Sequence, residues 1–152
     1  MDNDSLEIKT DVGTISKVFE DAYSVRVKVF VDEQHIPIAN ERDEFDDTAY
    51  HCVVYIGDIP VSCGRLSLNK GSAKICRVAT IKQFRGNGYA SKVCKTLIEL
   101  AKRENPQSIF LNAQITAMGM YKKLGFIAEG DVFYEENIEH IKMVFSEDSP
   151  YC

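Results

Sequence analysis

Apolar residues recur with helical spacing over residues 88–104, the clearest pattern in the chain. They fall at positions i, i+3, i+4, i+7, i+8 and i+11, while charged side chains occupy the opposite face. Pro106 disfavours helical backbone at Asn105. The pattern therefore predicts an amphipathic helix that ends before Pro106 and buries one stripe, formed by Ala90, Val93, Cys94, Leu97, Ile98 and Ala101.

Three apolar runs precede this helix, and short turn signals containing glycine separate them. Such spacing favours an antiparallel meander of strands. The three runs are residues 52–56, 61–68 and 73–81.

The carboxyl-terminal part predicts a strand, a short helix and two further strands. Residues 109–111 are apolar without alternation, which is typical of a strand buried on both faces. Residues 118–123 favour a helix that Gly125 ends, and the last two strands are predicted at 126–128 and 138–145.

The amino-terminal segment gives one clear and one conflicting prediction. Residues 6–9 indicate a strand, and apolar residues over 15–23 follow a helical period behind Thr14, a candidate N-cap. Residues 25–31 instead alternate valine with polar residues, and both this pattern and β-branching favour a strand.

Composition narrows the class of protein. The chain has 152 residues, of which 45% are hydrophobic and 27% charged, so we expect one globular domain spanning residues 1–152. No apolar run approaches the roughly 18 residues that cross a membrane, which predicts no membrane association. The acidic start, Met1–Asp4, leads into no apolar segment and argues against a secretory signal.

Charge and cysteine usage exclude further classes. The net charge of -5, without a basic stripe, argues against nucleic-acid binding. The odd number of scattered cysteines indicates a reducing, cytoplasmic compartment and argues against disulfides or a metal site. The oligomeric state stays open, with a homodimer as one alternative. The cysteines are Cys52, Cys63, Cys76, Cys94 and Cys152.

A glycine-rich turn, Arg85-Gly86-Asn87-Gly88-Tyr89-Ala90, leads into the predicted long helix. A helix N-terminus leaves backbone N–H groups unpaired, and glycines let the backbone approach a phosphate closely. A plain glycine turn into a core helix is the alternative interpretation. The chain lacks the Gly-Lys-Ser/Thr of a P-loop, and Ser91 stands where a dinucleotide fingerprint needs a third glycine.

This turn, the order of strands, Asn112-Ala113-Gln114 and residues 121–126 (YKKLGF) together resemble the GNAT superfamily of acetyl-CoA-dependent N-acetyltransferases. Residues 29–37, 111–114 and His140-x-x-Met143 resemble its small bacterial ElaA-like branch in particular. The resemblance implies an α/β fold of the α+β type, with a mixed, mostly antiparallel sheet and helices on both faces. It also implies a helix over residues 25–31, against the local alternation.

The resemblance implies acetyl transfer from acetyl-CoA, as co-substrate, to a primary amine of a small molecule or peptide through a ternary complex. It assigns the pyrophosphate to the turn, through Arg85, Gly86, Asn87, Gly88, Tyr89 and Ala90. Main-chain groups of Val78 and Thr80 and the side chain of Asn112 would bind the pantetheine arm. Tyr121 would be the general acid. Lys82 and Asn87 depart from the family pattern, which puts one charged phosphate contact in doubt.

The general base is left open among Glu33, Glu44, His51, His140 and a water-mediated route. The acidic segment Glu41–Asp47 is interpreted as a solvated loop, with attraction of a cationic acceptor as the alternative. Arg65 and Arg77 either face the cleft or serve ion pairs. A non-catalytic acyl-CoA-binding module and a ligand-free structural domain remain as rival functions.

Overall fold

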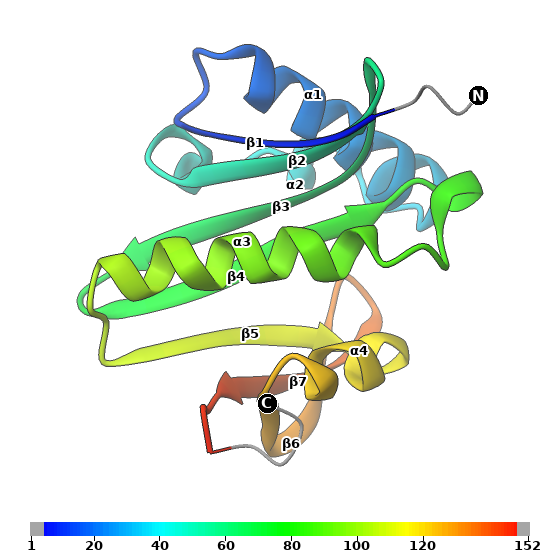
Figure 1. The fold of residues 1–152 in the computed structure, drawn as a ribbon. Helices are drawn as coiled ribbons and strands as arrows, with labels where there is room; N and C mark the ends of the chain where they lie inside the picture. The colour runs from blue at the N-terminus through cyan, green and yellow to red at the C-terminus, as the bar shows by residue number, and fades with distance from the viewer. Residues whose placement is uncertain (1–4, 149–152) are drawn as a thin grey trace.

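The computed structural model describes residues 5–148, within which seven strands form one sheet (Figure 1). The strand order is β1-β2-β3-β4-β5-β7-β6, and β4 and β5 are the parallel pair of an otherwise antiparallel sheet. This confirms the predicted sheet. The strands are β1 (Leu6–Val12), β2 (Tyr50–Ile56), β3 (Ile59–Asn69), β4 (Ser72–Thr80), β5 (Ser108–Gln114), β6 (Phe126–Glu135) and β7 (Ile138–Phe145).

Helices cover both faces of the sheet, as predicted. On one face α3 (Tyr89–Arg103) buries its apolar stripe, and on the other α1 (Lys17–Arg26) does so. Val54 of β2 packs in the cluster under α3, while its neighbour Val53 packs in the cluster under α1. Since both faces are buried, this strand needs no polar alternation. The remaining helices are a π-helix (Val27–Glu33), α2 (Ile38–Glu41), α4 (Met118–Lys123) and 3₁₀ turns at Glu44–Asp47, Lys82–Phe84 and Ile115–Ala117.

The first helix begins later than the sequence predicts, so the expected N-cap Thr14 is wrong. Ser16 is the N-cap, and its Oγ accepts a hydrogen bond from the N–H of Phe19 at 3.0 Å. The Thr14 hydroxyl donates instead to Asp47 Oδ1 at 3.1 Å. Ile15, which the pattern placed inside the helix, is 99% exposed.

Residues 25–31 are helical, which confirms the expectation from the resemblance over the local strand pattern. After α1 ends at Arg26, the π-helix continues to Glu33. The helical path places Val25, Val29 and Phe30 together against the sheet, and this tertiary burial outweighs the preference of β-branched residues for strands.

Strand β6 is longer than predicted and forms a hairpin with β7. The turn residues Glu136 and Asn137 both have left-handed backbone, with φ of 50° and 62°, which suits a tight hairpin. The polar residues after Ala128 hid this extension from the apolar pattern, because β6 is largely exposed.

No helix within residues 5–148 is long and apolar enough to cross a membrane. Over the same residues, no three His, Cys, Asp or Glu side chains are grouped as metal ligands would be. The predictions that concern Met1–Asp4 and Cys152 fall outside the described residues.

Candidate functional site

The central parallel strands separate part-way along their length. Residues Ser72–Ile75 of β4 pair with Ser108–Leu111 of β5. Beyond that point β5 pairs only with β7 among the described strands, and β4 continues alongside β3. The sheet therefore opens between the ends of β4 and β5, and two cavities lie at this opening.

The first, which we name the turn cavity, has a volume of about 580 Å³ and is lined by the predicted glycine-rich turn. Gly86 and Gly88 have φ of 86° and 79°, a conformation that favours glycine, and nothing lies within 4 Å of where a Cβ would stand. Gly88 is the N-cap of α3, without a side-chain cap. The first residues of α3 therefore line this cavity, and the unpaired N–H groups of a helix N-terminus suit a phosphate.

Two side chains of the turn are held by hydrogen bonds to other groups of the protein, although Arg85 also lines the cavity. Arg85 Nη1 and Nη2 donate to Glu33 at 2.7 and 2.6 Å, and its Nε donates to the Thr80 carbonyl at 2.9 Å. Asn87 Nδ2 donates to the Phe84 carbonyl at 3.0 Å, and its residue is not among those lining the cavity. The cradle therefore consists of backbone, with Arg85 tying the turn to β4 and to the π-helix.

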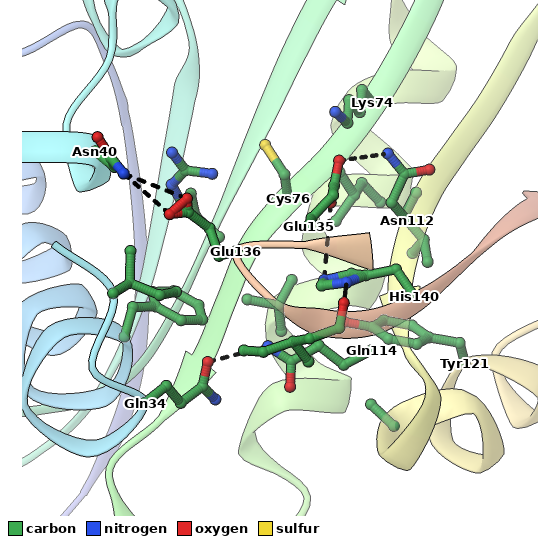
Figure 2. Close-up of a pocket in the computed structure, with 18 residues that line it drawn as sticks. Gln34, Asn40, Lys74, Cys76, Asn112, Gln114, Tyr121, Glu135, Glu136 and His140 are labelled. Atoms are coloured by element: carbon green, nitrogen blue, oxygen red, sulfur yellow. Dashed lines mark hydrogen bonds and ion pairs between the residues drawn. The ribbon is translucent and has the colours of Figure 1, made fainter. Parts of the chain in front are cut away.

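The second, the hairpin cavity, has a volume of about 480 Å³ and lies beneath the β6–β7 hairpin (Figure 2). Asn40 of α2 reaches across to the hairpin, and its Nδ2 donates to Glu136 Oε1 at 3.0 Å. Asn112 Nδ2 donates to Glu135 Oε2 at 3.5 Å. Asn112 thus lies in the hairpin cavity rather than in the turn cavity, where a pantetheine contact would suggest it.

The two cavities share a set of lining residues, which we name the junction: Gln34, Val78, Gln114, Ala117 and Tyr121.

At the junction, Gln114 Nε2 donates to Gln34 Oε1 at 3.1 Å and joins β5 to the end of the π-helix. Tyr121, on α4, is 7% exposed and packs edge-on against Phe126. Burial raises the pKa of the Tyr121 hydroxyl well above its ordinary value, so the group keeps its proton. Among the described residues this hydroxyl has no hydrogen-bond partner, which leaves it available as a donor.

His140, one of the candidate bases, lies in the hairpin cavity and is 8% exposed. Its Nδ1 lies 2.7 Å from the Ile138 carbonyl oxygen. Because a carbonyl can only accept, Nδ1 carries a proton, and in neutral imidazole Nε2 has the lone pair. Nε2 lies 3.7 Å from Glu135 Oε1, and the ring stacks on Phe133. This geometry can accept and hold a proton.

The other candidate bases line neither cavity. His51 is buried in the core, where its Nε2 donates to the Asp46 carbonyl at 3.0 Å and burial lowers its pKa. The Glu33 carboxylate accepts two hydrogen bonds from Arg85, and these lower the pKa of Glu33. Glu44 is exposed on a 3₁₀ turn.

A bulge in β4 shapes the junction. The β3–β4 register shifts after Cys76, and Arg77 adopts φ of 55°, a strained conformation for a side-chain-bearing residue. Contacts to the acidic segment hold it: Arg77 Nε lies 3.0 Å from Glu41 Oε2, and Nη2 lies 3.2 Å from Asp43 Oδ2. The bulge immediately precedes Val78, which lines both cavities.

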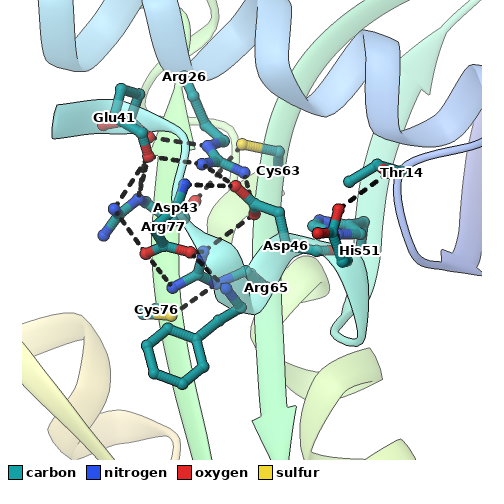
Figure 3. A network of polar contacts seen from close by, with 12 residues as sticks. Thr14, Arg26, Glu41, Asp43, Asp46, His51, Cys63, Arg65, Cys76 and Arg77 are labelled. Atoms are coloured by element: carbon teal, nitrogen blue, oxygen red, sulfur yellow. Dashed lines mark hydrogen bonds and ion pairs between the residues drawn. The ribbon is translucent and has the colours of Figure 1, made fainter. Parts of the chain in front are cut away.

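The acidic segment Glu41–Asp47 is only partly solvated, in contrast to the expectation from its composition, because Glu44 and Asp47 are exposed while two other carboxylates are buried (Figure 3). Glu41 is 2% exposed and Asp46 fully buried. Buried Arg26 donates to both, at 2.7 Å from Nε to Glu41 Oε2 and 2.8 Å from Nη1 to Asp46 Oδ1. Buried Arg65 donates to Asp46 Oδ1 at 2.9 Å. Arg65 and Arg77 both form ion pairs, and Arg77 also lines the hairpin cavity.

The hairpin brings residues to the site that no sequence pattern predicts. Glu135 and Glu136 line the hairpin cavity together with Asn40 and Lys74. The two left-handed residues at the hairpin turn include Asn137, a residue that tolerates this backbone. Asn137 could have indicated a hairpin turn at this point, but the Asn-Gly pair that usually marks such a turn is absent here.

The family model described as Acetyltransferase (GNAT) domain matches residues 18–147. The chain belongs to the GNAT family. It is an acetyltransferase, and its fold implies use of an acyl-CoA.

Individual relatives agree with this assignment. A Bacillus subtilis protein named Uncharacterized N-acetyltransferase YjcF is 33% identical over 90% of this chain and 99% of its own length. The structure of Escherichia coli ElaA superposes with a TM-score of 0.81 at 25% identity, over 92% of this chain and 99% of that chain. A Pseudomonas aeruginosa acyl-CoA N-acyltransferase gives 0.82 at 25% identity, over 93% and 100%.

Proposed function

We propose that this GNAT protein, as a single domain, transfers the acetyl group of acetyl-CoA directly to a primary amine of a small molecule within a ternary complex. The observation that carries the proposal is the meeting of two cavities at the junction, where β4 and β5 separate. One cavity presents a backbone cradle for phosphate, and the other presents polar side chains for an acceptor. Both substrates can therefore be held at once.

The residues of the turn cavity fit coenzyme A. The backbone around Gly86 and Gly88 would hold the diphosphate, because open space lies where a Cβ would stand and α3 begins there. Val78 and Thr80 line the path from the turn to the junction. Acetyl-CoA supplies the acetyl thioester, and the protein orients it.

One side chain of the hairpin cavity and one of the junction would move protons. An alkyl amine with a pKa near 10.4 is roughly 0.04% neutral at pH 7, so a base must remove its proton. Nε2 of His140, in the hairpin cavity, would accept that proton. The Tyr121 hydroxyl, kept protonated by burial, would donate a proton to the departing sulfur.

Acetyl-CoA is expected to stabilise the protein against heating. At 100 times its dissociation constant a ligand adds about 2.7 kcal/mol, which corresponds to a rise in Tm of roughly 5–10 °C for a chain of this size. The Gly88→Ala variant should lose most of this ligand-induced shift, because a Cβ enters the cradle. Differential scanning fluorimetry measures both.

Gly130→Ala is the matched control for this variant. Gly130 also has a left-handed φ, 83°, with nothing within 4 Å of a Cβ, but it lines neither cavity. Gly130→Ala should introduce the same backbone strain as Gly88→Ala. The rise in Tm that acetyl-CoA produces should nevertheless stay at the wild-type value in Gly130→Ala. An unchanged shift in Gly88→Ala would contradict the proposed cradle.

Replacing Tyr121 by phenylalanine should lower the rate of acetyl transfer by about 100-fold, the lower end of what acid–base groups contribute. The ring and its packing on Phe126 stay, so the acetyl-CoA thermal shift should persist. Release of free thiol from acetyl-CoA measures the rate. Full activity in Tyr121→Phe would remove Tyr121 from the mechanism, and binding of acetyl-CoA without turnover of any amine by the wild type would favour a non-catalytic module.

A further inference from the structure

The hairpin cavity contains two carboxylates that form no ion pair with a Lys or Arg of the described residues. Glu135 and Glu136 come from the β6–β7 hairpin, and neutral amides position them: Asn112 donates to Glu135, and Asn40 donates to Glu136. Within the described part of the chain, no Lys or Arg pairs with either one. Glu135 otherwise lies beside His140 Nε2, at 3.7 Å.

The cations lining the same cavity do not cancel this charge. Arg77 is already paired with Glu41 and Asp43. Lys74 has no ion pair among the described residues, and its single positive charge can offset only one of the two glutamates. The fixed charge that remains in the cavity is negative, in a chain whose net charge is -5.

A second feature of the cavity is a hydroxyl that is available to a ligand. Tyr121 is 7% exposed and lines the cavity, yet its hydroxyl has no hydrogen-bond partner among the described residues. The hydroxyl can therefore donate a hydrogen bond to a group that enters the cavity. Figure 2 shows Glu135 next to His140 and Asn112, on the same side of the cavity as Tyr121, with Glu136 on the opposite wall beside Asn40.

We propose that the acceptor is a small diamine or polyamine, an inference that rests on the proposed function. One amine reacts beside the junction, and His140 of the hairpin cavity removes its proton. The second stays protonated and binds Glu135 and Glu136 by charge-assisted hydrogen bonds, which are stronger than neutral ones. The negative cavity also attracts a dication as it approaches.

Three acceptors with the same four-carbon chain test this proposal: diaminobutane, butylamine and aminobutyrate, whose far ends are ammonium, methyl and carboxylate. We expect kcat/KM for diaminobutane to exceed that for butylamine by about tenfold or more, with aminobutyrate the poorest. In Glu136→Gln, the diaminobutane-to-butylamine ratio should fall by about tenfold. Preference for aminobutyrate, or an unchanged ratio in Glu136→Gln, would overturn the proposal.

Glu139→Gln is the matched control, because Glu139 lies on the same hairpin, is exposed and lines neither cavity. The diaminobutane-to-butylamine ratio of kcat/KM in Glu139→Gln should match that of the wild type. A tenfold fall in Glu139→Gln as well would make the effect one of overall charge and overturn the assignment to the cavity. Equal Tm values for the two variants verify that both fold.

Calorimetric titration of diaminobutane into the protein with coenzyme A separates this inference from the proposed function. Binding that Glu136→Gln weakens supports the diamine site even if no amine releases thiol, in which case the proposed transfer fails. Thiol release with butylamine, without any preference for diaminobutane, keeps the proposed transfer and rejects the diamine site. Absence of both binding and turnover rejects both.

Discussion

Replacing Asp46 by asparagine is expected to lower the free energy of unfolding by about 3–5 kcal/mol, the usual cost of removing one partner from a buried ion pair. Asp46 Oδ1 accepts from Nη1 of both Arg26 and Arg65, at 2.8 and 2.9 Å, and Oδ2 accepts from the Asp43 N–H at 3.0 Å. Asparagine keeps the shape but removes the charge, and its amide NH₂ competes with the arginine donors. Urea denaturation measures the loss.

Glu44→Gln provides the control, because it makes the same type of change on the same 3₁₀ turn. Glu44 is exposed and makes no hydrogen bond or ion pair with other described residues, so the effect should stay within about 0.5 kcal/mol. If Asp46→Asn and Glu44→Gln were equally stable, the network would contribute nothing, and the strained bulge at Arg77 would need another source of support.

The same network predicts how stability depends on pH. Burial alone would raise the pKa of Asp46, but hydrogen bonds and charge from Arg26 and Arg65 hold it well below its usual range. The folded-state pKa is thus lower than the unfolded one, so the stabilisation is present above the unfolded pKa, about 3.9, and is lost as pH falls through the folded pKa. Asp46→Asn should therefore flatten the acid side of the stability profile.

The sheet and the long helix were predictable because their signals are local. The stripe on α3 repeats with the helical period, and the strands before it are apolar and bounded by turns. The helical conformation of the π-helix segment could not be predicted from the local pattern, because it depends on burial of Val29 and Phe30 against the sheet. The resemblance supplied the helix there, but not its π geometry.

The turn cavity was predictable for the same reason, because the residues around Gly86 and Gly88 are contiguous in sequence. The hairpin cavity was not, because it joins α2, β5 and the β6–β7 hairpin, which lie far apart along the chain. The composition of the acidic segment predicts exposure to solvent for all of its carboxylates. Some are buried instead, because Arg26 and Arg65 from distant elements form ion pairs with Asp46. No sequence pattern distinguishes Glu135 and Glu136, although their carboxylates line the hairpin cavity.

Replacing His140 by glutamine is expected to lower kcat for acetyl transfer by about 1,000-fold, within the range for removal of a general base. Glutamine can still donate a hydrogen bond toward the Ile138 carbonyl, but it cannot accept a proton at neutral pH. The acetyl-CoA thermal shift should be unchanged, because His140 does not line the turn cavity. Initial rates of thiol release, with a saturating amine, give the loss in kcat.

A base and a merely structural histidine differ in how the loss responds to pH. If Nε2 removes the proton, raising the pH increases the neutral fraction of the amine itself, so the deficit of His140→Gln should shrink as pH approaches the pKa of the amine. A structural defect would persist at every pH. His51→Gln is the contrasting variant: the imidazole there donates to the Asp46 carbonyl and lines neither cavity, so its loss should appear in Tm rather than in the pH dependence of kcat. If the loss in kcat of His140→Gln were the same at every pH, His140 would not be the base, and a water-mediated route would replace it.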